Sequence, residues 1–422
     1  MTPPSRPALA PRIHAYAASF GEDLARDIIA GSTAPGTTIL DPFVGSGTTA
    51  LQSLLLNRHA IGIDIDPIAS RISRVLTTRV DVDCLRAATD GFKDELNGFE
   101  EALVGRPSVY QDLGPGSTFE VGLQSFSVPT EPAIAFWFDS THMATLAVAR
   151  RLVEQEPNPL IQQIFEVTLS SAIIRKWPNT LSYAMDIDHS RPHRPRHVKA
   201  QPIERQFALI HRVLRKVTET VLDIQVLLQS VDTSVSIYES DAIEQLSALD
   251  PECVDFVLTS PPYLNAIDYP RAHKFSQWWL SPGQDPLGRA EYLGLRRSPI
   301  RDDGLQLPLL PEISELIAKF EDGKSYRTIL RYVSDLTAII EQTHRVTKPG
   351  AQVVFIVADN VLEGKVFPVS GIVAELFSHH GFSYVTTTRR TIKSTRRRYP
   401  FGINGFVNTM KDEYLVTGRK PE

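Results

Sequence analysis

In the first part of the chain, short apolar runs bounded by turn residues predict strands. Residues 37–43 and 60–66 form two such runs, with the turn "VGSGTT" and the helical segment "ALQSLLLNR" between them. A strand, a glycine turn, a helix and a second strand in this order begin a parallel α/β sheet. The preceding segment "GEDLARDIIAG" has helical spacing and predicts a helix with Gly31 as its C-cap.

The middle of the chain, residues 85–233, has the period of 3.6 that is typical of amphipathic helices, and little strand signal. Its longest helical patterns are "THMATLAVARRLVEQE", "LIQQIFEVTLSSAIIRKW" and "PIERQFALIHRVLRKVTETVLDIQVLLQ". We therefore expect a mostly helical insertion over 85–233, between an N-terminal part, residues 1–84, and a C-terminal part, residues 234–422.

The strand pattern resumes in the C-terminal part. Residues 234–242, 253–262 and 349–360 predict strands, and "RTILRYVSDLTAIIEQTHRV" predicts a long helix before the last of them. The segments "FSYVTTTRRTI" and "EYLVTGRK" predict an antiparallel pair at the edge of the sheet. A Pro- and Gly-rich stretch at 281–312 predicts a functional or disordered loop. The predicted fold class is α/β, with a mostly parallel sheet, an antiparallel edge strand and a large helical insertion.

Composition restricts the classes of protein to consider. The 422 residues are 42% hydrophobic and 22% charged, which is ordinary for a soluble globular protein. No apolar run approaches the roughly 18–20 residues of a membrane span, and the start of the sequence has no signal-peptide core. Cys84 and Cys253 are too few for a disulfide framework, and the 11 histidines show no metal-ligand spacing. We expect a cytoplasmic protein with no membrane partner and no metal.

Two local basic segments stand out against a net charge of −5. Residues 389–398 contain six basic side chains, and residues 189–199 contain four basic side chains among three histidines. A local patch is enough for nucleic-acid contact, and a solvated face is an equally good interpretation of a single charge run. The candidates for nucleic-acid contact are Arg191, Arg194, Arg196, Arg396, Arg397 and Arg398.

The glycine turn carries the first candidate chemistry. Gly45 and Gly47 lie in "DPFVGSGTTA" and Asp64 closes the next strand, which fits a dinucleotide fingerprint or any other ribose-bearing cofactor. A carboxylate just before the turn, that of Asp41, would repel a pyrophosphate and attract an ammonium group. The helix N-terminus at Thr48 suits a carboxylate. These residues favour S-adenosylmethionine, which has an ammonium, a carboxylate and an adenosine ribose, over a nicotinamide dinucleotide.

Four segments resemble motifs of one family, the DNA amino-methyltransferases that act on cytosine N4 or adenine N6. "DPFVGSGTT" with "IGIDIDP" resembles the cofactor motif, and "TSPPY" at 259–263 resembles the catalytic motif. "RIHAYAASF" is similar to the N-terminal cofactor-contact segment, and "VTKPGAQVVFIV" resembles the lead into a later strand. The resemblance covers about 10–80 and 234–420. It implies a Rossmann-like methyltransferase sheet, S-adenosyl-L-methionine as cofactor, double-stranded DNA as partner and a cognate restriction endonuclease as a further candidate partner.

The order of the motifs departs from the subfamily with the most similar cofactor motif. There the Ser-Pro-Pro-Tyr motif usually comes first, whereas here it follows the cofactor motif and the helical insertion. Circular permutation within the family accounts for the difference and leaves open which segment reads the DNA sequence. We expect the insertion, the loop 281–325 and the basic segment 389–398 to form the DNA-facing cleft, because none of them is needed to complete the sheet.

The resemblance assigns roles to individual residues. The cofactor-binding candidates are Asp41, Pro42, Phe43, Gly45, Gly47, Thr48, Asp64 and Asp241. The family position of Asp241 contacts the adenine amine of the cofactor, and a solvent-exposed helix cap is the alternative. The catalytic candidates are Ser260, Pro261, Pro262 and Tyr263.

The catalytic motif suits methylation of an exocyclic base amine. Such an amine is a poor nucleophile because its lone pair is delocalised into the ring, and hydrogen bonds to fixed acceptors draw the nitrogen out of conjugation. The side chain of Ser260 and the carbonyl of Pro261 are the candidate acceptors, which the prolines make rigid. The base must be flipped out of the duplex, and Tyr263 offers a face on which it can stack, worth about 1–3 kcal/mol.

The segment after this motif, "DYPRAHKFSQWWL", mixes basic and aromatic residues. Arg271, His273 and Lys274 are candidates to face nucleic acid. The residues expected in the core are Phe275, Trp278 and Trp279.

Several functions remain open on the sequence alone. Serine at the first motif position is commonest among the N4-cytosine enzymes, which favours cytosine N4 over adenine N6. Methylation of an RNA base or of a glutamine side chain is an alternative, and the basic segments weigh against the protein substrate. A non-catalytic methyltransferase-like module that binds nucleic acid is another alternative, against which the intact motifs weigh.

Overall fold

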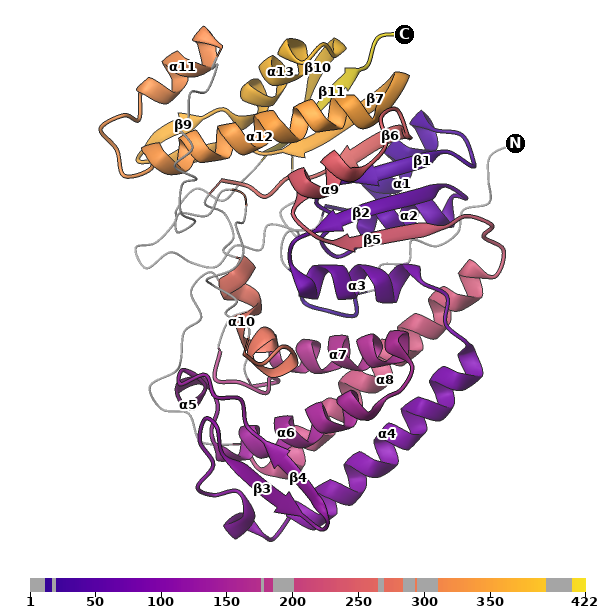
Figure 1. Ribbon diagram of the computed structural model, residues 1–422, viewed down its shortest axis with the longest axis vertical. Helices are drawn as coiled ribbons and strands as arrows, with labels where there is room; N and C mark the ends of the chain where they lie inside the picture. The colour runs from indigo at the N-terminus through magenta and orange to yellow at the C-terminus, as the bar shows by residue number, and fades with distance from the viewer. Residues whose placement is uncertain are drawn as a thin grey trace.

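A seven-stranded sheet forms the centre of the α/β part of the protein, as Figure 1 shows. The computed structural model describes residues 12–16, 20–175, 178–184, 201–264, 269–283, 293, 310–391 and 412–422. The strands of the sheet are β1 (Thr38–Asp41), β2 (His59–Asp64), β5 (Val235–Glu239), β6 (Val254–Thr259), β7 (Thr347–Val357), β10 (Ser383–Thr391) and β11 (Asp412–Arg419). Their order is β10-β11-β7-β6-β1-β2-β5.

Most of this sheet is parallel. The neighbours from β5 through β2, β1 and β6 to β7 all pair in parallel, and β11 pairs antiparallel with β7 on one side and with β10 on the other. The predicted α/β fold, with a mostly parallel sheet and an antiparallel edge, is therefore confirmed.

Alternate residues of β6 point to opposite faces of the sheet, and helices cover both faces. The helices of this part are α1 (Glu22–Ser32), α2 (Thr48–Leu55), α3 (Pro67–Thr77), α9 (Ala242–Ala248), α12 (Tyr326–Val346) and α13 (Val369–His379). Val257 belongs to the core that α9, α12 and α13 share with the sheet. Phe256 and Leu258 belong to the core on the other face, with α1. In Figure 1, α3 lies between the sheet and the helices of the insertion.

The predicted C-cap of the first helix is wrong. Gly31 lies inside α1, and Thr33 is the C-cap. Both the backbone N–H of Thr33 and its hydroxyl donate to the carbonyl of Ile29, at 3.0 and 2.6 Å. The chain leaves the helix through an extended Thr33, with φ −137° and ψ 154°, so no left-handed glycine is needed there.

The region between α3 and β5 is mostly helical, as expected, but it also contains a hairpin that the sequence pattern did not reveal. Its helices are α4 (Val82–Leu103), α5 (Ile134–Trp137), α6 (Ser140–Gln155), α7 (Pro159–Ile173) and α8 (Ile203–Leu228), with a 3₁₀ turn over Pro107–Val109. The hairpin pairs β3 (Thr118–Val121) with β4 (Gln124–Ser127). Phe119 and Phe126 lie on its buried side, and their rings are stacked with the centroids 5.4 Å apart. Strands of four residues are too short to show a reliable alternation.

The core of the insertion continues into the segment after the catalytic motif, α10 (Tyr269–Leu280). The rings of Phe275 and Trp279 lie 5.9 and 5.7 Å from that of Phe138, and Trp278 is also buried, so these aromatic residues are core residues as predicted. The division at 84 and 233 stays a prediction.

The remaining elements flank α12. They are α11 (Pro311–Ala318), β8 (Asn360–Leu362) and β9 (Lys365–Phe367), the last two paired as an antiparallel hairpin. Across the ranges described above, no helix is both long enough and apolar enough to span a membrane.

Candidate active site

The two sequence motifs meet at one edge of the sheet. β1 and β6 are parallel neighbours, with Leu40 opposite Val257, so both strands end at the same edge. At that edge the hydroxyl of Thr259 donates to Oδ1 of Asp41 at 2.6 Å. Ligands of open α/β sheets bind at the carboxyl ends of the strands. The cofactor and catalytic motifs therefore belong to one site.

Asp41 is a buried carboxylate at the centre of this site. Its side chain is 2% exposed and also accepts the backbone N–H of Phe43 at 3.1 Å. Burial raises the pKa of Asp41 to about 6, although its hydrogen bonds, that from Thr259 first, act in the opposite direction. No described Lys, Arg or His forms an ion pair with it. A buried carboxylate in this state favours a ligand with a positive charge.

The turn after β1 requires glycine at two positions. Gly45 and Gly47 have φ angles of +50° and +84°. A Cβ on Gly47 would lie 3.1 Å from the Cα of Ser73, and one on Gly45 would lie 3.2 Å from Cε1 of Tyr16. Gly47 is the N-cap of α2 and offers no side chain to the first turn, so the N–H groups from Thr48 onward suit an anionic group.

The other two residues of this motif are packed into the protein. Pro42 is buried. Phe43 is partly buried and packs against the core that α12 and α13 share with the sheet. Both hold the turn against the sheet.

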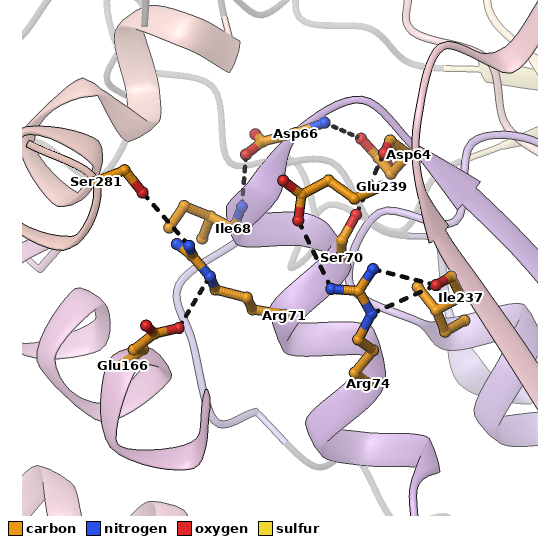
Figure 2. Close-up of polar contacts among 10 residues, drawn as sticks. All are labelled: Asp64, Asp66, Ile68, Ser70, Arg71, Arg74, Glu166, Ile237, Glu239 and Ser281. Carbon is orange, nitrogen blue, oxygen red and sulfur yellow. Dashed lines mark hydrogen bonds and ion pairs between the residues drawn. The ribbon is translucent and has the colours of Figure 1, made fainter. Parts of the chain in front are cut away.

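Asp64 ties the glycine turn to the start of α3. Its Oδ2 accepts the N–H of Gly45 and its Oδ1 accepts the N–H of Asp66, both at 2.9 Å, and Figure 2 shows the second of these bonds. Burial, followed by the neighbouring Asp66 carboxylate, raises the pKa of Asp64 to about 7. The side chain stays partly exposed. Each oxygen keeps a further lone pair, so a ribose hydroxyl is a chemically suitable additional donor.

Asp241 is a helix cap in the structure. It is the N-cap of α9, and its Oδ1 accepts the N–H groups of Ile243 and Glu244 at 2.8 and 3.1 Å. The N–H of Ser240 donates to the carbonyl of Asp64 at 3.0 Å, which places this turn beside the second strand. Capping uses Oδ1 for both bonds, and contact with a cofactor through Oδ2 stays a prediction.

The catalytic motif forms a short loop that is fixed at both ends. Ser260 and Tyr263 face each other, with 3.4 Å from the serine Oγ to the tyrosine hydroxyl, and Pro261 is buried. Before the loop, the hydroxyl of Thr259 donates a hydrogen bond to Asp41. After the loop, Nδ2 of Asn360 donates a hydrogen bond of 2.6 Å to the carbonyl of Leu264. Pro262, between these anchors, is partly buried.

Sequence reasoning missed both anchors of this loop. Thr259 could have been found, because it is the last strand residue before the motif and ends beside the other motif. Asn360 gave no sequence signal. It comes just after β7, the strand next to β6, and only the pairing of Thr259 with Phe355 brings it near the loop.

The structure does not test the arginines predicted to contact nucleic acid. The six arginines named for this role all lie outside the described residues. Of the same basic segment, Arg389 and Arg390 are described, and they pair with Asp412 and Glu413 of the neighbouring strand at 2.7 and 3.1 Å.

The expectation for His273 is wrong, because its side chain is 2% exposed and bound to Asp66. Lys274 lies over the rings of Trp137, Phe275 and Trp278. Arg271 is partly buried. In the part of the chain that the structure describes, no group of three or more His, Cys, Asp or Glu side chains could hold a metal ion.

Comparison with known proteins agrees with this geometry. A profile of the N6/N4 family, described as DNA methylase, matches residues 4–74, which include the glycine turn and Asp64. Two relatives align with most of the chain, and both are type II methyltransferases. M.MvaI of Kocuria varians is 22% identical over 404 residues, 91% of this chain and 84% of its own. M.BsoBI of Geobacillus stearothermophilus is 22% identical over 436 residues, which cover 92% of this chain and 82% of its own.

Residues 4–74 thus resemble the N6/N4 DNA methylase family, and both proteins that align with most of the chain are methyltransferases by name. The resemblance to this family implies S-adenosyl-L-methionine as the methyl donor. The buried Asp41 and the glycine turn fit this donor, because they offer a carboxylate to its ammonium group and a helix N-terminus to its carboxylate.

Solved structures overlap with this chain only loosely. A Thermus thermophilus protein described as a DNA modification methylase, crystallised with S-adenosyl-L-methionine, covers 43% of this chain and 54% of its own, with 21% identity and a TM-score of 0.24. The rRNA methyltransferase AviRa of Streptomyces viridochromogenes covers 95% of this chain and 86% of its own, with 10% identity and a TM-score of 0.26. Neither overlap is close enough for a comparison of individual site residues.

Proposed function

We propose that this protein is an S-adenosyl-L-methionine-dependent methylase that modifies the exocyclic amine of a base flipped out of double-stranded DNA, with cytosine N4 favoured over adenine N6. The observation that carries the proposal is the hydrogen bond from Thr259 to Asp41, since it joins the catalytic motif to the carboxylate of the cofactor motif. Serine rather than Asp or Asn at position 260 favours cytosine as the target.

The cofactor would be held by three carboxylates and one helix end. Asp41 would bind its ammonium group, the N-terminus of α2 at Thr48 its carboxylate, Asp64 its ribose hydroxyls and Asp241 its adenine amine. When bound, S-adenosyl-L-methionine supplies a methyl group on a positively charged sulfur, which makes that methyl electrophilic. Burial of Asp41 supports its assigned role, because a carboxylate attracts an ammonium group more strongly away from water.

The catalytic loop would activate the base amine without a general base of shifted pKa. Ser260 Oγ and the carbonyl of Pro261 would accept hydrogen bonds from the two N–H groups of the amine, which draws the nitrogen lone pair out of the ring. Once the nitrogen is methylated, its surplus proton would pass to water. The two loop anchors support this role, because an acceptor that is already fixed reorganises little at the transition state. Tyr263, whose hydroxyl lies 3.4 Å from Ser260, would stack on the base.

We infer that the helical insertion and the segments around the active site contact the DNA. The basic segments at 189–199 and 389–398 support this assignment. Replacing Arg396, Arg397 and Arg398 by Ala should weaken binding to all sequences and lower the salt slope by up to about three units. Arg389→Ala is the matched control. Because Arg389 already pairs with Asp412, its replacement should leave the salt slope unchanged.

A restriction endonuclease is the proposed functional partner of this methylase. The relatives M.MvaI and M.BsoBI are named as type II methyltransferases, which supports a place in a restriction-modification system. Methylated DNA from an expressing host should then resist one endonuclease of the same recognition sequence.

Native DNA sequencing of a methylation-free bacterial host that expresses the protein tests the proposal. We expect N4-methylcytosine in one short sequence motif. N6-methyladenine would move the target to adenine, and unmodified DNA with a modified RNA base or glutamine would support a rival substrate. A chain that leaves every polymer unmodified and fails to bind S-adenosyl-L-methionine in calorimetry would be the non-catalytic module.

A further inference from the structure

A buried contact joins the helix after the catalytic loop to the cofactor loop. Nδ1 of His273, on α10, lies against Oδ2 of Asp66, and the two side chains are 2% and 1% exposed. An ionised carboxylate only accepts hydrogen bonds, so Nδ1 of His273 is the donor. Burial of both partners keeps water from replacing either of them.

Asp66 has three contacts that fix its position. Besides its bond with His273, its Oδ1 accepts the N–H of Ile68 and so caps α3, and its own N–H donates to Oδ1 of Asp64, both at 2.9 Å. Figure 2 shows these last two bonds at the start of α3. Because Asp64 also holds Gly45, a displacement of Asp66 would shift the carboxylate and the glycine turn together.

The helix that carries His273 is held in place by independent links. Ser276 Oγ lies 2.7 Å from Ser170 Oγ of α7. Arg71 of α3 pairs with Glu166 of α7 at 2.9 Å and reaches Ser281, just after α10, at 3.4 Å (Figure 2). α10 is thus anchored to α7 whether or not His273 is present, and among the described residues of α10 it is His273 that contacts Asp66.

The ring of His273 has a second neighbour at the cofactor loop. Tyr16 packs against it with the ring centroids 5.3 Å apart, and the same tyrosine lies against Gly45. The bond from Nδ1 of His273 to Asp66 supports Asp64, and the ring of His273 lies beside the tyrosine that contacts the glycine turn.

We propose that His273 is a positioning residue for the cofactor site, acting on the Asp64 carboxylate through Asp66. It also links that carboxylate to the catalytic loop, since α10 follows the loop in the chain. His273 takes no part in the chemistry. The inference rests on the proposed function only for the ligand, S-adenosyl-L-methionine.

Two substitutions separate the donor of His273 from its ring. His273→Phe keeps a ring and loses the donor, whereas His273→Asn keeps an N–H donor and loses the ring. We expect His273→Phe to weaken S-adenosyl-L-methionine binding about tenfold or more in calorimetry, the scale of a hydrogen bond to a charged group, and His273→Asn to bind within a few-fold of the native protein. Single-turnover methylation at saturating cofactor should be nearly unchanged in both variants.

Ser276→Ala is the matched control, because it removes a buried polar contact from the same face of α10 without touching Asp66. It should lower thermal stability and leave cofactor affinity unchanged.

The proposal is overturned if His273→Phe binds the cofactor like the native protein, or if Ser276→Ala weakens binding equally. If His273→Phe does not fold, the affinity of His273→Asn for S-adenosyl-L-methionine tests the proposal. An affinity within a few-fold of the native protein supports it, and a tenfold loss contradicts it. A native protein that does not bind S-adenosyl-L-methionine at all would instead contradict the proposed function.

Discussion

The hydroxyl of Thr259 donates a hydrogen bond of 2.6 Å to the carboxylate of Asp41, across 218 positions of the chain. Thr259 ends β6 and Asp41 ends β1, and their side chains are 0% and 2% exposed. The next residue after Thr259 is Ser260. This buried contact thus sets the position of the catalytic loop relative to the carboxylate of Asp41.

Thr259→Val keeps the shape of the side chain and removes this donor. Asp41 then loses a hydrogen bond that lowers its pKa, so the pKa rises further above 6 and less of the carboxylate is charged near neutral pH. We expect cofactor binding to weaken about tenfold, more at pH 6 than at pH 7.5, as measured by calorimetry.

Thr145→Val is the control for this variant. The hydroxyl of Thr145 is buried in α6 and has no hydrogen-bond partner among the residues described. The control should bind the cofactor normally, and an equal loss in both variants would contradict the role given to Thr259.

Asp41→Asn should make the protein without cofactor more stable at neutral pH. Its folded pKa of about 6 lies above the ordinary 3.8, so the native state binds the proton more tightly than the unfolded chain does, and stability falls as pH rises from about 4 to about 6. Asparagine keeps Oδ1, which accepts both hydrogen bonds, and removes the charge. The gain at pH 7 is on the order of 3 kcal/mol.

Urea unfolding of the two proteins at several pH values measures this effect. The Asp41→Asn variant should show a shallower fall in stability between pH 4 and 6, because the raised pKa of Asp64 still contributes to it, and it should bind S-adenosyl-L-methionine poorly. Parallel stability curves for the two proteins would show that the buried carboxylate is not the group that titrates.

Asn360→Ala should slow methyl transfer without changing cofactor affinity. It removes the 2.6 Å hydrogen bond to the carbonyl of Leu264, which anchors the end of the catalytic loop far from Asp41. We expect about a tenfold loss of single-turnover rate, because a loop acceptor displaced by a fraction of an ångström stabilises the transition state less.

Asn158→Ala is the comparison for this substitution. Asn158 caps α7 in the insertion, so its loss should cost about 1 kcal/mol of stability and leave the rate unchanged. Equal rates for Asn360→Ala and Asn158→Ala would remove Asn360 from the positioning of the loop.

The sheet could be predicted because its signals are local. The central strands β1 and β6 are short apolar runs, and the glycines at 45 and 47 are needed by a turn that a side chain would block. The motif acids Asp41 and Asp64 follow from the predicted strands, since each is the last residue of its strand.

The contacts that assemble the site could not be predicted. The bonds from Thr259 to Asp41, from Asn360 to Leu264 and from His273 to Asp66 join residues far apart in the chain, so no periodicity reveals them. His273 illustrates the difficulty, because a histidine among basic residues suggested an exposed nucleic-acid contact and the fold buries it.

The central claim is that the loop from Ser260 to Tyr263 performs the chemistry rather than closing a strand. Ser260→Ala removes an acceptor that acts mainly in the transition state, and the cofactor is held by other residues. Tyr263→Ala should differ, because it weakens capture of the flipped base as well as slowing the reaction.

The most direct measurement is single-turnover methyl transfer to DNA by Ser260→Ala, with S-adenosyl-L-methionine binding measured in parallel. We predict that the rate falls by roughly two orders of magnitude or more while cofactor affinity hardly changes. A variant that methylates at a near-native rate would contradict the account, because the loop would then be only structural.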